Sequence, residues 1–224
     1  MTHLFTQTAT VLFLGTGIAA AAPAALHPVP EEAYRIRVEA PYLADASQIQ
    51  VQYSGFWQRE DYALLRSNRA QAEVVYSAAD RYENAALEIP MTFAQARDSF
   101  AVNRDASRRL GAIERVEAPD RTIFYQPYRL TDNGWSCIAV KSEWNHVGRD
   151  PRNRPARLMF GYICDTSGAA MTAERAETLA LSIETSGTEV KWTGNGPVLA
   201  NPDVIGNASF PFRFGVHFND HDSD

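Results

Sequence analysis

The chain has 224 residues, of which 45% are hydrophobic, and its 27 acidic and 21 basic residues give a net charge of −6 at pH 7. This length is enough for one domain with a buried core and a short extension. An acidic chain without a dense basic segment is a poor nucleic-acid binder, because phosphate neutralisation dominates that affinity. Nineteen of the basic residues are Arg and two are Lys, a bias typical of GC-rich bacterial genomes.

Residues 4–26 carry no charge and pass from an apolar stretch into small residues at 19–25. That order predicts a secretory signal peptide over residues 1–24, cleaved after Ala21 or Ala24. The basic residues that usually precede such a stretch are missing, so an uncleaved membrane anchor is the alternative, since a segment of this length can just span a bilayer. Together with the bacterial composition, the leader predicts a periplasmic or secreted protein.

Two alternating segments follow the leader. Apolar and polar side chains alternate in 34–39 and again in 48–56, which is the period of a half-buried strand, and we expect these two strands to pair. Residues 58–84 are ambiguous, because they fit a helical stripe and also contain a run of β-forming residues at 72–77. We favour a short strand at 72–77 followed by a short helical turn.

Two helices are predicted from their starts and their apolar stripes. Thr92 and Gln95 have the spacing of a capping box, in which each side chain accepts a backbone hydrogen bond, and the pattern continues to about residue 109. Thr172 can cap a second helix that runs to about 186, where Gly187 can end it.

The segment between the helices predicts three consecutive antiparallel strands at 122–130, 135–144 and 157–164. Asn133-Gly134 favours a two-residue type I′ turn, in which Asp132 opposes Trp135. Pro127 has no amide hydrogen, so we expect its position to face a sheet edge.

The register of the second hairpin places the only two cysteines of the chain, Cys137 and Cys164, opposite each other. If Trp144 opposes Arg157, then Cys137 opposes Cys164, at a Cα separation that a disulfide accepts. A slip of one residue would put the two side chains on opposite faces. We therefore predict a structural disulfide, which also fits an oxidising compartment.

These elements predict an α+β fold, with a mainly antiparallel sheet of five or more strands and both helices packed on one of its faces. We expect a single domain at 34–190, followed by an extended C-terminal arm at 191–224. The arm ends in an acidic tail, and an alternation of Phe residues at 210–218 suggests one last strand within it.

Four arginines in and beside the loop 145–156 are the first candidate site. Guanidinium groups can hold a carboxylate, a phosphate or an acidic partner through paired hydrogen bonds. The alternative is a solvated hairpin loop with an internal pair between an arginine and Asp150. The candidate residues are Arg149, Arg152, Arg154 and Arg157.

The acidic tail is a weak candidate for a metal site through His217, Asp220 and His221, because terminal segments are usually mobile. We expect no cofactor. The motifs of serine hydrolases, zinc proteases and P-loop enzymes are all missing, so no catalytic residue is predicted.

The sequence therefore predicts an exported bacterial periplasmic protein that binds rather than catalyses. Its partner would be an envelope protein or a small anionic ligand, with membrane contact only through an uncleaved leader. The alternative is an envelope hydrolase with an aromatic-lined cleft between sheet and helices.

Overall fold

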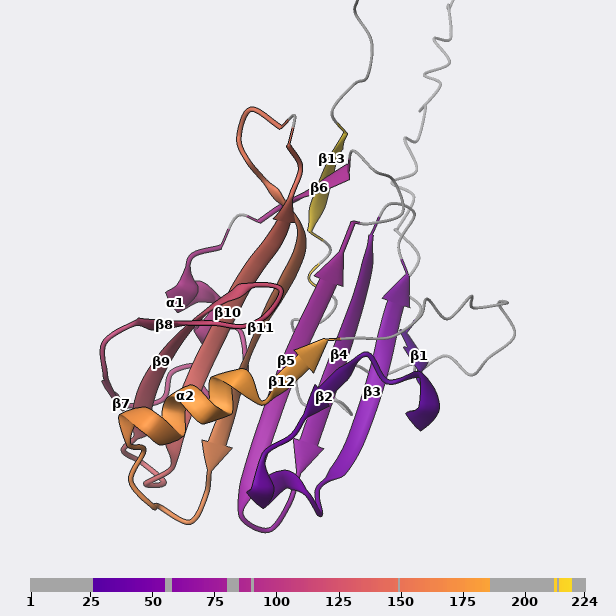
Figure 1. The fold of residues 1–224 in the computed structure, drawn as a ribbon. Coiled ribbons are helices and arrows are strands. Elements are labelled where there is room, and N and C mark those ends of the chain that lie inside the picture. The colour runs from indigo at the N-terminus through magenta and orange to yellow at the C-terminus, as the bar shows by residue number, and fades with distance from the viewer. Residues whose placement is uncertain are drawn as a thin grey trace, which may run out of the picture.

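The computed structural model describes residues 26–54, 58–79, 85–89, 91–148, 150–185, 212 and 214–218. Among these residues, nine strands form one antiparallel sheet (Figure 1). Its main path runs β1 (Leu26–Pro28), β3 (Ser47–Ser54), β4 (Arg59–Arg66), β5 (Ala70–Ala78), β11 (Pro155–Asp165), β10 (Ser136–His146), β9 (Thr122–Leu130) and β7 (Arg108–Leu110). The ninth strand, β8 (Glu114–Glu117), pairs with β9 beside β7.

Two smaller antiparallel ladders and two α-helices complete the described fold. One ladder joins β2 (Ile36–Val38) to β12 (Ile183–Thr185), and the other joins β6 (Ala85–Glu88) to β13 (Gly215–Phe218). The helices are α1 (Phe93–Asp98) and α2 (Ala173–Leu181), and two short 3₁₀ helices are η1 (Glu31–Ala33) and η2 (Pro41–Leu43). The predicted α+β class, with a mainly antiparallel sheet and two helices, is confirmed.

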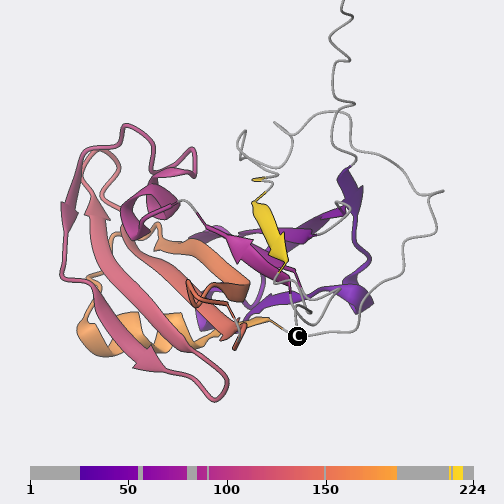
Figure 2. The same cartoon turned by 90° about the horizontal axis from the view of Figure 1, so that it is seen from above.

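The two helices cover opposite faces of the sheet, where we expected a shared face (Figure 2). Neighbouring residues on a strand point to opposite faces. Val74 packs in the cluster that contains Leu179 of α2, whereas Val75 packs in the cluster that contains Ala96 of α1. An apolar stripe shows that a helix is buried but does not show against which face. We call these two layers the α2 face and the α1 face.

Both helices are shorter than predicted. The capping box forms as expected, with Gln95 N donating to Thr92 Oγ1 at 3.3 Å and Thr92 N donating to Gln95 Oε1 at 2.8 Å. Helix α1 nevertheless ends at Asp98, and a turn that includes the positive φ of Asp105 leads into β7. Helix α2 ends at Leu181, because the residues after it extend into β12 and pair with β2.

The first predicted strand pair is wrong. Strand β2 pairs with β12, and β3 pairs with β1 and β4. Glutamine side chains of β3 take the place of a ladder, since Gln48 Nε2 donates to Ile36 O at 3.0 Å and Gln50 Oε1 accepts from Arg35 N at 3.1 Å. The two segments are therefore neighbours without forming a sheet.

The ambiguous region contains a hairpin of two long strands, β4 and β5. The predicted strand at 72–77 is confirmed within β5, while the helical turn expected after it falls mostly outside the described residues. In β4, seven successive residues from Arg59 to Leu65 are buried. A strand covered on both faces loses the alternation that identifies a strand in sequence, which is why β4 was not predicted.

The three consecutive strands β9, β10 and β11 are confirmed, with one correction at the first turn. Leu130 N bonds Trp135 O at 2.9 Å, so the loop has four residues and the ladder is offset by two from the predicted pairing. Gly134 has φ +73°, whereas Asn133 uses its side chain to accept from Trp135 N at 3.0 Å. Because the offset is even, each side chain keeps its predicted face.

Pro127 faces the outer side of the sheet, where we expected an edge and where the structure has the short strands β7 and β8 with a gap between them. Its carbonyl accepts a hydrogen bond from Gly111 N at 2.8 Å, and residues 111–113 separate β7 from β8 at this point. The missing amide hydrogen of Pro127 therefore breaks the edge into two short strands.

Strands form on both sides of the predicted domain limits, β1 in the main sheet and β13 in the separate ladder with β6. Strand β1 lies before residue 34, and β13 lies inside the predicted arm, where the alternating Phe residues suggested a strand. The division at 34–190 and 191–224 itself stays a prediction, and residues 1–24 lie outside the described residues. Within the described ranges, neither helix is long and apolar enough to cross a bilayer.

Candidate functional site

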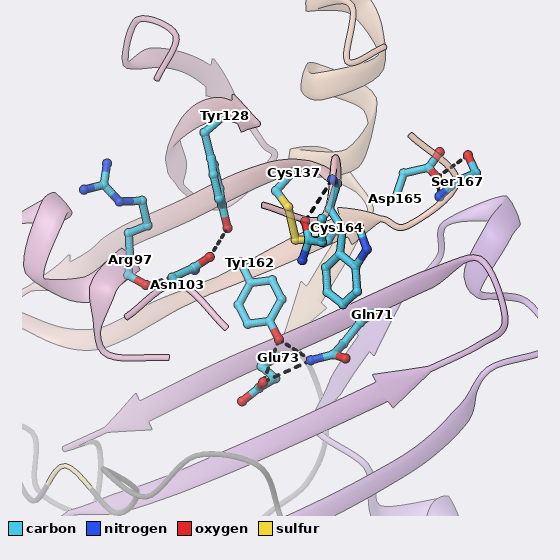
Figure 3. The surroundings of a disulfide bond; sticks show 12 residues. Gln71, Glu73, Arg97, Asn103, Tyr128, Cys137, Tyr162, Cys164, Asp165 and Ser167 are labelled. Atoms are coloured by element: carbon cyan, nitrogen blue, oxygen red, sulfur yellow. Dashed lines mark hydrogen bonds between the residues drawn. A yellow bond between two sulfur atoms is a disulfide. The ribbon is translucent and has the colours of Figure 1, made fainter. Parts of the chain in front are cut away.

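The predicted disulfide lies on the α1 face, deep in its core (Figure 3). Cys137 and Cys164 are paired across β10 and β11 with Cα atoms 4.0 Å apart, and both side chains are fully buried. The predicted register is thereby confirmed. A disulfide without solvent access, packed beside Tyr128 and Tyr162, has the position of a structural cross-link.

A buried carboxylate and two tyrosines lie next to the disulfide. Glu73 Oε1 accepts a hydrogen bond from the Tyr162 hydroxyl at 2.6 Å, and its Oε2 accepts one from the Tyr62 hydroxyl at 2.5 Å. Gln71 Nε2 donates to the Tyr162 oxygen at 2.6 Å (Figure 3). Burial raises the pKa of Glu73 although both tyrosines oppose that rise, and burial together with Glu73 raises the pKa of Tyr162.

A second polar network fixes α1 to the sheet. The Tyr128 hydroxyl donates to Asn103 Oδ1 at 2.7 Å, and Asn103 Nδ2 donates to the carbonyl of Arg97 at 3.0 Å. Arg97 Nη1 in turn donates to Gln126 Oε1 at 2.8 Å. All four side chains are buried. A helix as short as α1 is not stable by itself, so these hydrogen bonds to β9 and to the following turn hold it in place.

The position of α1 creates a cleft between its first residue and the strands β9 and β10. The cleft has a volume of about 270 Å³. The capping box starts the helix at Phe93, and the interruption opposite Pro127 supplies Ile113. Its lining residues are Phe93, Ile113, Phe124, Lys141, Ser142 and Glu143. We call this cavity the α1 cleft.

The walls of the α1 cleft are apolar and its charges are already paired. Ile113 is 53% exposed and Phe124 is 44% exposed, which is unusual for side chains of this size. Lys141 Nζ lies 2.6 Å from Glu143 Oε1 and donates to Met91 O at 3.0 Å. The cleft therefore presents apolar surface beside a neutral ion pair, an arrangement that favours an uncharged apolar group.

Two further cavities lie elsewhere in the described part of the chain. One, of about 340 Å³, lies between η2 and α2, where the Arg175 guanidinium stacks over the Tyr42 ring at 5.0 Å and forms an ion pair with Asp165. Burial raises the pKa of Tyr42 to about 12. The other, of about 300 Å³, is an open depression beside Pro127. The described lining of each of these two cavities contains one Leu, Ile, Val or Phe residue, Leu179 in the first and Leu110 in the second, whereas that of the α1 cleft contains three.

The candidate arginines do not form one cluster among the described residues. Arg154 bonds Asp150 through Nε at 2.8 Å and reaches Glu88 at 2.8 Å through Nη1. Hydrogen bonds from Arg154 hold the pKa of Asp150 well below its usual range. Arg152 is exposed, and Arg149 lies outside the described residues. The anion-binding hypothesis stays a prediction. The Arg154 guanidinium is already paired with Asp150 and Glu88.

Arg157 belongs to the sheet, on the α2 face. It opposes Ala78 of β5, which in turn opposes Arg59 of β4, so the small alanine lies between two arginines. Arg59 makes two hydrogen bonds to Asp61, at 2.9 and 3.0 Å. On the other side Arg157 opposes Trp144, whose ring lies 5.8 Å from that of Tyr76 and 5.0 Å from the Arg121 guanidinium.

The predicted metal site is largely outside the described chain. The backbone of His217 belongs to β13, opposite Ala86, and Asp220 and His221 lie outside the described residues. In the described ranges, no group of three or more His, Cys, Asp or Glu residues could hold a metal ion.

Comparison with known proteins returned nothing: no family model, curated protein or solved structure matches this chain. In the sequence, Phe93 simply follows the predicted cap Thr92, and no pattern singles out Ile113 or Phe124. The one usable signal was Pro127, whose missing amide predicts a position that faces a sheet edge; the structure shows that this edge is interrupted there, where Ile113 lies.

Proposed function

We propose that this chain is an exported protein of the bacterial envelope that binds a small ligand through an apolar group, without catalysing a reaction on it. The observation that carries the proposal is the α1 cleft. Ile113 and Phe124 are two of the five large hydrophobic side chains that are exposed among the described residues, and both line this cavity. Apolar surface concentrated in a cavity is typical of a binding site.

The size and charge of the α1 cleft set the class of ligand. A volume of about 270 Å³ holds one aromatic ring system or a short alkyl chain. Because Lys141 and Glu143 neutralise each other, the cleft offers little attraction to a bare anion. This ligand chemistry departs from the small anion that the arginines suggested.

The hydrolase alternative would also place its site between the sheet and a helix. Hydrolysis by paired carboxylates needs two of them within reach of one substrate bond. The described lining of the α1 cleft contains one carboxylate, Glu143, and it forms an ion pair with Lys141. Binding is thus the function that the cleft supports better.

A neutral fluorescent probe, phenylnaphthylamine, tests the proposed binding. We expect saturable fluorescence enhancement with the wild-type chain, and affinity at least about tenfold weaker in Ile113→Ser and Phe124→Ser, since each removes about 1.5–3 kcal/mol of apolar contact. Ile49→Ser and Leu181→Ser are matched controls, because these side chains are 45% and 41% exposed but lie outside the cleft. Equal losses in all four variants would sink the proposal.

Export is tested separately on the full-length chain expressed in a Gram-negative host. The uncharged leader and the buried disulfide both support export. We expect the mature protein in the periplasmic fraction, with a mass that corresponds to cleavage after Ala21 or Ala24. Recovery of the uncleaved chain in the cytoplasm, with free thiols, would contradict this part of the proposal.

A further inference from the structure

The C-terminal residues Phe212 and Phe214 and the strand β13 (Gly215–Phe218) are held by two separate parts of the molecule. The buried carboxylate of Glu60, at the start of β4, accepts hydrogen bonds from the backbone N–H of Phe212 at 2.7 Å and of Phe214 at 3.4 Å. Beyond it, β13 pairs with β6 from Gly215 opposite Glu88 to Phe218 opposite Ala85. We call Glu60, Phe160 and β6 together the strand dock.

The strand dock has the chemistry of a peptide-binding site. In an extended chain, alternate N–H groups point to the same side, so one carboxylate can accept from residues i and i+2. The side chains of the same two residues also make contacts. The Phe212 ring lies 4.9 Å and the Phe214 ring 6.2 Å from the Phe160 ring. The rings of Phe212 and Phe214 stack on each other at 5.7 Å. Backbone pairing with aromatic anchors at alternate positions is how strand addition recognises peptides.

The occupied dock lies at one end of the molecule. Figures 1 and 2 both show β6 and β13 side by side at the end of the main sheet, away from the turn that joins β9 to β10. The chain between Thr185 and Phe212 is long enough to reach roughly 90 Å when extended. A neighbouring molecule is therefore within reach of the segment that fills the dock.

We propose that the strand dock accepts Phe212–Phe218 from a second copy of this chain, so that two molecules exchange their C-terminal strands. The second copy is the occupant with the matching chemistry, because its segment reproduces each contact that the structure shows in one chain. The chain's own segment competes at an effective concentration in the millimolar range. Exchange is therefore favoured at high protein concentration or when the chain's own segment cannot dock.

A pair of complementary full-length variants tests the exchange. The first, Glu60→Ala, loses the acceptor of both backbone hydrogen bonds but keeps its C-terminal segment. The second carries Phe212→Pro and Phe214→Pro, which remove the two donors and both rings, but keeps its dock. Each variant alone is expected to have the mass of a monomer in light scattering, whereas their equimolar mixture is expected to form a 1:1 complex with twice that mass.

The controls separate docking from non-specific association. Mixing the proline variant with a chain that carries all three substitutions is expected to form no complex. If both single-function variants are folded by circular dichroism and their mixture stays monomeric, the exchange is overturned.

A second measurement covers the case in which Glu60→Ala does not fold. A fluorescent peptide of residues 210–218 is titrated into the proline variant, with the same peptide carrying both prolines as its control. An affinity of the unmodified peptide at least ten times that of the proline peptide supports the exchange. Equal or absent binding of the two peptides overturns it.

Discussion

Gly161 on β11 lies against the backbone of Glu73 on β5, with no room for a side chain between them. A Cβ atom at residue 161 would approach the carbonyl oxygen of Glu73 to 2.4 Å and the Cα atom of Val74 to 2.9 Å. Both strands are in the middle of the sheet, and Glu73 also anchors the tyrosine network. Any side chain at 161 must therefore push two central strands apart.

Gly161→Ala is expected to lower the free energy of unfolding by about 1–3 kcal/mol, the usual cost of overpacking a core. Urea denaturation followed by circular dichroism measures it. Gly148→Ala is the matched control, because a Cβ at 148 would meet no atom within 4 Å. Similar losses in the two variants would show that glycine itself, rather than the close approach of the strands, is what matters.

The disulfide is expected to contribute to stability as a constraint on the unfolded chain. It closes a sequence separation of 27 residues, which corresponds to about 3.5 kcal/mol in the chain-entropy model. The double variant Cys137→Ala with Cys164→Ala should lose about this much unfolding free energy, since alanine leaves no polar group in the buried site. Mass spectrometry of the unreduced wild-type protein checks the disulfide pairing itself, and free thiols at both positions would refute it.

The central strands could be predicted because several local signals agreed. The register that paired Trp144 with Arg157 also brought Cys137 and Cys164 together, and each observation supports the other. The turn before Trp135 was predicted less well, because Asn133 bonds through its side chain and only Gly134 adopts positive φ. Ser107 also contacts the loop from outside, through hydrogen bonds with Thr131 and Asp132, and no local pattern in the sequence indicates this contact.

The cleft could not be predicted, because its residues are brought together by tertiary structure. Phe93 comes from a helix start, Ile113 from a break in the edge and Phe124 from a strand. The alternation of β9 places Phe124 on the same face as the buried Tyr128, a position that is typical of a core residue. Its exposure goes with the position of α1, which hydrogen bonds of Arg97 with Asn103 and Gln126 hold against the sheet and which no local pattern shows.

The arginine loop offers a direct comparison of two neighbouring charges. Arg154 lies between Asp150 and Glu88, whereas Arg152 is exposed and contributes its backbone N–H to Asp150. Arg154→Glu would place a third carboxylate between these two and is expected to lower the melting temperature. Arg152→Glu should leave it nearly unchanged, because an exposed charge in solvent interacts weakly. Equal melting temperatures of the two variants would show that the Arg154 pairs contribute nothing measurable.

The buried carboxyl group of Glu73 is expected to make stability depend on pH. Burial raises its pKa in the folded protein above the usual value of 4.5, so the folded state binds its proton more tightly than the unfolded state does. The stability that this proton contributes is fully present below pH 4.5 and is lost as the pH rises through the folded-state pKa. Each pH unit by which the pKa is raised corresponds to about 1.4 kcal/mol.

Glu73→Gln replaces the carboxyl group by a neutral amide of the same shape, which no longer titrates. Relative to this variant, the wild-type protein is therefore expected to lose unfolding free energy as the pH increases from 4.5 toward neutrality. Urea denaturation at intervals between pH 4 and pH 8 measures the difference, with the exposed Glu117→Gln as a control for surface charge. Parallel stability curves for wild type and Glu73→Gln would mean that the tyrosine hydrogen bonds offset burial completely, and that Glu73 is ionised in the folded core with its ordinary pKa.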